Sequence, residues 1–286
     1  MSKVVGLLHP GEMGAAVAQC LLSRGHTVLW ASAGRGPATA ARAAGFQDVG
    51  SVDAVTARAD IILSICPPHA ALDVARAASG FRGLYVDANA VSPATAREVA
   101  SIVGESVDRS VDRSVDGFVD GFVDGFVDGG IIGGPPTEPG GTRLYLCGEH
   151  AADVAALFDG TLLDARAIPG EPGAASALKM AYAGWTKGTS ALILAIRALA
   201  RAEGVEDALL AEWALSQPGQ AARSEQAARS AAAKGWRWIA EMEEIAATMT
   251  ADGLPGGFHQ AAAEVYRRSG TDPDLDAVLN ALKGKA

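Results

Sequence analysis

Residues 4–14, VVGLLHPGEMG, constrain the fold more than any other stretch of the chain. Val4 to Leu8 is a continuous apolar run of strand length, and an alanine-rich stretch of helical character begins at Gly14. Gly11 and Gly14 lie three positions apart in and after the turn between them. A buried strand that leads through a glycine turn into a helix is typical of the first unit of an α/β sheet.

The rest of the first half alternates short apolar runs with alanine-rich segments. Strands are predicted at Val4–Leu8, Thr27–Trp30, Ile61–Ile65 and Leu84–Asp87, and helices at Gly14–Ser23, Ala38–Ala44, His69–Ala78 and Pro93–Val103. Apolar strands separated by helices indicate a parallel sheet covered on both faces. From about Pro172 the chain changes to long alanine-rich helices. We therefore expect a Rossmann-type doubly wound α/β domain at 1–168 and an all-α domain at 169–286.

Residues 107–130 repeat Val-Asp every four positions. A period of four matches neither a helical face nor a common solenoid unit. Aspartates suggest calcium as an alternative, but calcium loops place oxygen ligands at every second position, so no metal site is expected. We interpret 107–126 as a loop expanded by duplication, followed by a strand at Phe126–Asp128.

Composition excludes several classes of protein. With 286 residues and 49% hydrophobic content, the chain can form two cores. Its net charge of -9 argues against general nucleic-acid binding. Cys20, Cys66 and Cys147 are too scattered for a disulfide framework, which suits the cytoplasm, and no signal peptide is predicted. The most apolar stretch, Ala191–Ala200, contains Arg197 and is too short to span a membrane.

The glycine turn predicts a dinucleotide site. In such turns the second glycine lets the backbone approach the pyrophosphate, and the third lets the helix pack against the strand. Gly11 and Gly14 take these places, whereas His9 replaces the first glycine. The alternative is a purely structural turn in an unrelated α/β protein. The predicted cofactor-binding turn comprises His9, Pro10, Gly11, Glu12, Met13 and Gly14.

The segment after the second strand predicts which dinucleotide binds. An NAD site usually has an acidic residue there for the ribose 2′-hydroxyl, but none occurs between Trp30 and Asp48. Ser32 and Arg35 stand there instead. A hydroxyl and a guanidinium suit a 2′-phosphate, so NADP is favoured over NAD. The alternative for Arg35 is a solvated loop charge.

Further motifs occur in order between residue 4 and about residue 203. They are Gly11-Glu12-Met13-Gly14, Cys66-Pro67-Pro68, Asp87-Ala88-Asn89-Ala90-Val91-Ser92-Pro93, DGGIIGG at 128–134, Gly141-Thr142 through Gly148, and Gly173 to Lys179. Together they resemble the β-hydroxyacid dehydrogenase family, which includes 3-hydroxyisobutyrate and 6-phosphogluconate dehydrogenases and is related to imine reductases. The C-terminal stretch RWIAEMEEIAATMTADGLPGGFHQ resembles a divergent branch whose C-terminal domain is uncharacterised.

This resemblance implies roles for several residues. It places Cys66, Pro67, Pro68 and Asn89 on the cofactor side, and it makes Lys179 the catalytic lysine of a homodimer. The loop Ile132, Gly133 and Gly134 would contact a small-molecule substrate. Two departures set this chain apart: Ile132 replaces a serine, and Tyr182 and Ala183 replace two asparagines. Both changes remove polar groups that bind a carboxylate or orient the lysine.

A helix predicted over Ala174–Ala202 carries the proposed chemistry. Polar residues share one face of it, namely Lys179, Tyr182, Thr186, Ser190 and Arg197. Gly184 and Gly188 weaken a helix, so they indicate close packing. We expect Lys179 to exchange a proton with the substrate and Tyr182 to be a second donor. The alternative for Lys179 is a surface lysine whose ammonium extends into solvent. Thr186, Trp238, Glu241 and His259 are further substrate candidates. Aromatic residues such as Trp238 are more often core packing, Glu241 belongs to a cluster that is partly a solvated face, and a histidine at a helix start without chemistry is at least as common.

The sequence as a whole predicts an NADP-dependent oxidoreductase. It would transfer hydride between nicotinamide and a small alcohol or carbonyl substrate, with a lysine as proton donor or acceptor. Two alternatives remain open: an imine reductase acting on a C=N bond, and a non-catalytic NADP-binding protein.

Overall fold

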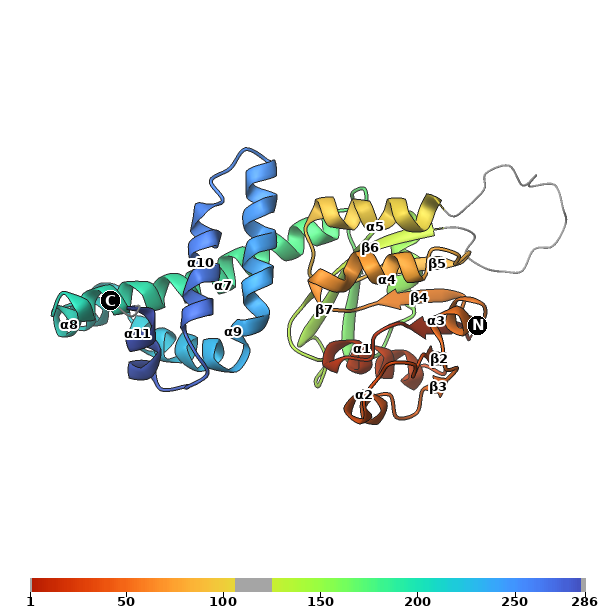
Figure 1. Ribbon diagram of the computed structural model, residues 1–286, viewed down its shortest axis with the longest axis horizontal. Helices are drawn as coiled ribbons and strands as arrows, with labels where there is room; N and C mark the ends of the chain where they lie inside the picture. The colour runs from red at the N-terminus through yellow and green to blue at the C-terminus, as the bar shows by residue number, and fades with distance from the viewer. Residues whose placement is uncertain (1, 106–124, 284–286) are drawn as a thin grey trace, which may run out of the picture. The chain divides into compact units, whose positions relative to one another are not determined.

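The computed structural model describes residues 2–105 and 125–283 (Figure 1). The chain divides into two units, Met1–Lys179 and Met180–Ala286, which are considered separately below. The expanded loop predicted at 107–126 lies outside the described residues except for its last two positions.

The first unit is built on an eight-stranded sheet in the order β3-β2-β1-β4-β5-β6-β7-β8. Its strands are β1 (Val4–Leu7), β2 (Thr27–Trp30), β3 (Gln47–Asp48), β4 (Ile61–Ser64), β5 (Leu84–Asp87), β6 (Gly125–Ile132), β7 (Thr142–Cys147) and β8 (Leu163–Ala167). Neighbours pair in parallel except β6 and β7, which are antiparallel. The order reverses direction at β1, as in doubly wound sheets.

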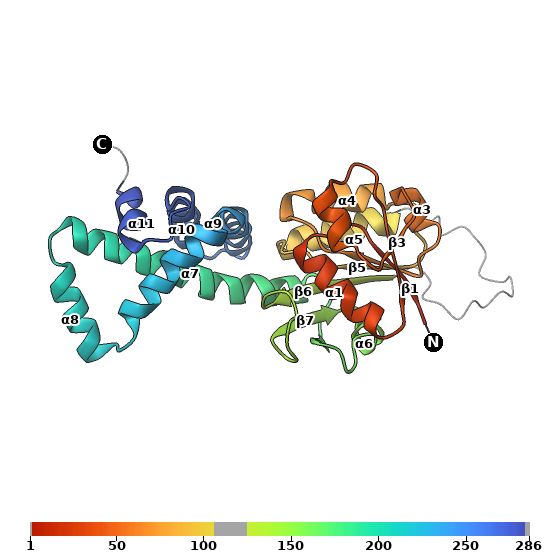
Figure 2. The ribbon, with the colours of Figure 1, turned by 90° about the horizontal axis from the view of Figure 1, so that it is seen from below.

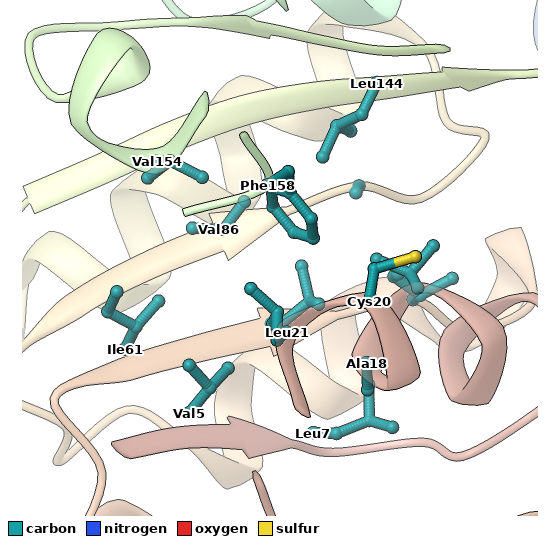
Figure 3. Close-up of a cluster of buried hydrophobic side chains, with 14 of the residues drawn as sticks. Val5, Leu7, Ala18, Cys20, Leu21, Ile61, Val86, Leu144, Val154 and Phe158 are labelled. Carbon is teal, nitrogen blue, oxygen red and sulfur yellow. The ribbon is translucent and has the colours of Figure 1, made fainter. Parts of the chain in front are cut away.

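Helices cover both faces of this sheet. Among them are α1 (Glu12–Ser23), α2 (Pro37–Arg42), α3 (Val52–Thr56), η1 (Pro68–Ala70), α4 (Ala71–Ala77), α5 (Pro93–Glu105) and α6 (Ala151–Ala156). Figure 2 shows α1 and α6 on one side of the sheet and α4 and α5 on the other. Figure 3 shows one of the two cores, where Leu21 and Phe158 pack against Ile61, Val86 and Leu144. Alternate strand residues supply the other core, such as Ile62 and Tyr85.

The predicted α/β class and its first four apolar strands are confirmed. The strand predicted at Phe126–Asp128 is also confirmed, as part of β6. The sheet is not wholly parallel, because β7 returns antiparallel to β6. The short edge strands β3 and β8 were not predicted. Their residues are mostly partly exposed and polar, so they lack the apolar run of a central strand.

The second unit is helical. Helix α7 (Ala174–Ala202) has the bounds that its sequence predicts; it begins in the first unit and continues into the second. It is followed by α8 (Glu206–Ser216), α9 (Gln220–Ala251), α10 (Gly257–Arg268) and α11 (Leu275–Leu282). Helices α9 and α10 lie side by side in both views (Figures 1 and 2). The Trp238 and Tyr266 rings meet edge to face between them, with centroids 5.1 Å apart.

The chain divides inside α7, after Lys179, whereas the predicted boundary at 168–169 lies in the turn before this helix and stays a prediction. In the part of the chain that the structure describes, no helix is both long enough and apolar enough to cross a membrane.

Candidate functional site

The glycine turn follows β1 and leads into α1. A Cβ added at Gly14 would lie 2.7 Å from the carbonyl oxygen of His9, so Gly14 is needed for the helix to pack against the turn. Gly11 differs. Of the described residues, only His9 comes near a Cβ added at Gly11, with its Cδ2 atom at 3.5 Å, and the φ angle of Gly11 is an ordinary -70°. The protein itself does not require a glycine at position 11.

The start of α1 has the features of an anion site. Gly11 is the N-cap residue, and it has no side chain to accept from the first N–H groups of the helix. These groups and the helix dipole favour a negative charge at this point. The first N–H groups of α1 therefore have no side-chain cap, and packing within the protein does not explain the glycine at position 11. A phosphate-bearing ligand could bind at this helix start.

Arg35, which follows β2, reaches back to this turn. Its Nη1 atom lies 2.9 Å from Nδ1 of His9, and its Nη2 donates to the Leu8 carbonyl oxygen at 3.1 Å. Arg42 on α2 donates from Nε to the Pro10 carbonyl oxygen at 3.2 Å. Burial, together with the charges of Arg35 and Arg42, lowers the pKa of His9. The His9 ring is therefore neutral near pH 7, and its Nδ1 accepts from Arg35.

Arg42 was missed by sequence reasoning. In the sequence, Arg42 is only a second cation seven positions after Arg35, and this spacing does not by itself predict a phosphate-binding pair. The structure brings both guanidinium groups to the glycine turn, so two positive charges lie beside it.

Asp48, the nearest acidic residue after β2, forms hydrogen bonds with the backbone of neighbouring loop residues. Its carboxylate accepts from the backbone N–H of Gly50 at 2.9 Å and of Ser32 at 3.2 Å. The hydrogen bonds from Gly50 and Ser32 lower the pKa of Asp48. The hydrogen bond from the backbone of Ser32 holds the segment that carries Arg35.

Cys66 and Asn89 follow β4 and β5 at the same edge of the sheet. The Asn89 side chain is buried: its Oδ1 accepts from the Cys66 N–H at 2.5 Å, and its Nδ2 donates to Ser64 Oγ at 3.0 Å and to the Asp87 carboxylate. Asn89 thus ties the ends of β4 and β5 together. Burial, and then the Asp87 charge, raise the pKa of the Cys66 thiol to about 12, so it is no nucleophile near pH 7. Pro67, which is exposed, and Pro68 lead into η1.

Asp128 on β6 holds the beginning of α7. Its buried carboxylate accepts from the N–H of Gly173 at 2.9 Å, the N–H of Ser176 at 3.0 Å and the Ser176 hydroxyl at 2.6 Å. These are N–H groups of a helix start, which have no partner inside the helix. Asp128 is therefore a cap supplied from the sheet. Beside it in register lies Asp87, whose pKa is raised to about 7 by burial and then by the Asp128 charge.

Lys179 comes to the same part of the sheet through α7. A Cβ added at Gly130 would lie 2.6 Å from the Ala175 carbonyl oxygen and 3.0 Å from Lys179 Cβ. Gly130 lies on β6 two positions beyond Asp128, which pairs with the last residue of β5. The half-buried Lys179 therefore lies at the carboxyl edge of the parallel strands. The glycine turn and the Asn89 cluster follow strands that end at that edge.

The loop predicted to contact substrate turns back from β6 to β7. Ile132 is the last residue of β6, and its side chain is buried in the core. Gly133 has φ +122°, and a Cβ there would lie 2.6 Å from the Gly141 carbonyl oxygen. The Thr142 hydroxyl donates to the Gly134 carbonyl oxygen at 2.6 Å. These contacts fix the shape of the loop, and its role toward substrate stays a prediction.

In the second unit, two of the predicted residues gather around Lys187. The Lys187 ammonium forms an ion pair with Glu241, which is 5% exposed, and lies 5.5 Å from the centroid of the Trp238 ring. The Tyr266 hydroxyl donates to the Lys187 carbonyl oxygen at 2.6 Å. Sequence reasoning missed Lys187, because its partners lie more than fifty positions away.

His259 explains the two glycines within α7. A Cβ added at Gly184 or Gly188 would lie 3.1 Å from His259 Nε2, and this nitrogen lies 3.1 Å from the Gly184 carbonyl oxygen. The close packing that the glycines predict is confirmed, with an imidazole as the partner. Tyr182 is 45% exposed on α7, and Thr186 donates to the Tyr182 carbonyl oxygen at 3.0 Å. The substrate and proton-donor roles of these residues stay predictions.

No group of three or more His, Cys, Asp or Glu side chains among the described residues is placed to hold a metal ion.

Comparison with known proteins supports the resemblance inferred from sequence. Residues 200–269 match a domain of unknown function, DUF1932. No curated protein matches the chain. Among solved structures, the conserved protein MTH1747, of unknown function and described as structurally similar to 3-hydroxyacid dehydrogenases, is 26% identical, with a TM-score of 0.67. The similarity covers 92% of this chain and 98% of that protein.

Two other structures with the same fold are enzymes. The 3-hydroxyisobutyrate dehydrogenase of Mycobacterium tuberculosis, solved with L-serine, is 18% identical with a TM-score of 0.67, over 99% of this chain and 100% of that one. A reductive aminase from Aspergillus terreus, solved with NADPH and ethyl levulinate, is 18% identical with a TM-score of 0.54, over 94% of each chain. At these identities the likeness is one of fold.

Proposed function

We propose that this chain, which has a 3-hydroxyacid dehydrogenase-like fold and carries a DUF1932 domain, is an NADP-dependent oxidoreductase. One observation carries the proposal. The uncapped start of α1, a glycine that the protein does not itself require, and two guanidinium groups converge at the end of β1.

The residues at this corner fit the cofactor part by part. Gly11 and the first N–H groups of α1 would hold the pyrophosphate. Ser32 and the Arg35 guanidinium would hold the 2′-phosphate, with Arg42 adding positive charge. The Cys66-Pro67-Pro68 segment is at the same edge and would border the nicotinamide half. When bound, such a cofactor supplies or accepts the hydride. The reductive aminase structure with NADPH supports this choice by analogy of fold.

Lys179 would move the proton. Asp128 and Gly130 keep the first turns of α7 against β6, which places the lysine at the edge where the cofactor turn also lies. Its ammonium would donate to the substrate oxygen as a carbonyl is reduced, and the amine would take the proton back in the opposite direction. For this step we propose a small alcohol or carbonyl compound as the substrate.

Reduction of a C=N bond is the second candidate. The position that resembles the family's serine is Ile132, and the positions of its two asparagines are Tyr182 and Ala183. Loss of these polar groups favours a substrate without the carboxylate of a simple hydroxyacid. The reductive aminase has the same fold.

A substrate panel tests the proposed activity. Hydroxyacids, aldehydes and cyclic imines are each incubated with the enzyme, and NADPH absorbance is followed. With any active substrate, Lys179→Ala should lower kcat by at least about 100-fold while NADPH still binds. The exposed Lys234 on α9 offers a matched control, and Lys234→Ala should keep wild-type activity. Unchanged turnover in Lys179→Ala would remove the lysine from the mechanism, and no turnover with any substrate would favour a non-catalytic NADP-binding protein.

We also propose a homodimer. Large apolar side chains that are 38–73% exposed follow one another along α7 at spacings of three, seven, four and three positions: Tyr182, Trp185, Leu192, Ile196 and Leu199. A row of this spacing forms one seam of a helix, and a seam of this length is rarely left in water. Light scattering should give the mass of two chains for the wild type. Joint substitution Trp185→Glu and Leu192→Glu should give one chain, and an unchanged mass would refute this seam as the interface.

A further inference from the structure

His9 replaces the first glycine of the turn, and its ring contacts the Arg35 guanidinium. Resting on the proposed function, we infer that His9 is a positioning residue for NADPH: it holds Arg35 against the glycine turn and thereby sets the preference for NADPH over NADH.

The contacts of Arg35 make this case. Nη1 meets the His9 ring at 2.9 Å and Nη2 meets the Leu8 carbonyl oxygen at 3.1 Å, so the guanidinium plane is fixed at two points. A long arginine side chain in a loop otherwise samples many rotamers, and immobilising it on binding reduces affinity. The remaining N–H groups of the guanidinium stay available for phosphate oxygens.

Histidine can provide this support and glycine cannot. A glycine at position 9 has no side-chain acceptor, which would leave only the Leu8 carbonyl oxygen for Arg35. The charged groups that face the His9 ring are Arg35 from the β2–α2 loop and Arg42 from α2. Both cations disfavour a charged imidazole, so the ring stays neutral and keeps an acceptor at Nδ1.

The site is also separate from catalysis. Phosphate recognition at the ends of β1 and β2 discriminates NADPH from NADH, because the two cofactors differ only in the 2′-phosphate. A residue that acts on this phosphate alone changes the affinity for NADPH and leaves the affinity for NADH nearly unchanged. General damage to the turn weakens both.

Direct titration of the full chain tests the inference. Dissociation constants for NADPH and NADH are measured by nicotinamide fluorescence with the wild type, His9→Gly, His9→Asn and Arg35→Ala. In His9→Gly the Kd for NADPH should rise about tenfold, the loss expected for one hydrogen bond to a charged group, and the Kd for NADH should change less than about twofold. Asparagine keeps an acceptor, so His9→Asn should restore much of the preference. Arg35→Ala should lose at least as much NADPH affinity as His9→Gly.

The outcomes separate this inference from the proposed function. An unchanged ratio of the two constants in His9→Gly, or equal weakening of both cofactors, would overturn the inference and leave the NADP assignment standing. A wild type that binds neither cofactor would overturn both. The exposed Arg58 gives the control, because Arg58→Ala removes a cation from the first unit and should move neither constant.

Discussion

Replacing Asp128 tests whether the sheet holds the beginning of helix α7. The Asp128 carboxylate is fully buried and accepts three hydrogen bonds from the first turn of α7, two from the N–H groups of Gly173 and Ser176 and one from the Ser176 hydroxyl. Asp128→Ala removes the acceptor and leaves these donors without it in a buried place.

The expected cost follows from these bonds. A hydrogen bond to a charged group contributes about 1.5–3 kcal/mol, and each buried donor left unsatisfied costs about 1–3 kcal/mol. Because these terms overlap, we expect Asp128→Ala to lower the free energy of unfolding by about 3–5 kcal/mol. Ser176→Ala removes only the hydroxyl donor and should cost about 1–2 kcal/mol.

Urea unfolding followed by circular dichroism measures both values. The control is Asp153→Ala: Asp153 is an exposed acid on α6 that pairs with His150 at 3.2 Å, and its loss should cost less than about 0.5 kcal/mol. If Asp128→Ala cost no more than this control, the cap would not hold α7. If Ser176→Ala cost as much as Asp128→Ala, the hydroxyl rather than the carboxylate would be the important group.

Two further predictions follow from buried contacts. Gly14→Ala should lower the free energy of unfolding by about 1–3 kcal/mol, because the added Cβ would meet the His9 carbonyl oxygen. Gly11→Ala should leave the melting temperature nearly unchanged and weaken NADPH binding. Equal melting temperatures for the two variants would contradict this prediction. The raised pKa of Asp87 means that the folded chain binds a proton between pH 3.8 and about pH 7 that the unfolded chain releases, so Asp87 makes stability fall as pH rises through this window. Asp87→Asn should flatten that part of the stability profile measured in urea, and an unaltered slope would refute the shift.

Much of the fold was accessible from local patterns. The first four central strands are apolar runs between turn residues, and each was predicted within a residue or so. The short edge strands were not predicted, because β3 has only two residues and β8 has no alternation: its first residue is buried and its last two are exposed. The antiparallel direction of β7 was also not predicted, because the direction of a strand depends on the path of the preceding loop and not on the strand's own residues.

The candidate site divides in the same way. The glycine turn, Arg35 and Lys179 came from motifs that are contiguous in sequence. The contact between His9 and Arg35 spans 26 positions and that between Asp128 and Ser176 spans 48. Asn89 was predicted as a cofactor residue, and the structure adds a second task for it, the joining of β4 and β5.

The sequence by itself determined the central strands, the glycine turn and the long helix α7, and it indicated which residues could take part in chemistry. Local spacing fixes which residues can form a strand, a glycine turn or a helix, and residue type fixes whether a group can bind phosphate or move a proton. Only the tertiary structure decided which groups meet. Folding brings His9 to Arg35 and Asp128 to the start of α7 because the sheet order and helix packing set distances that no local pattern contains.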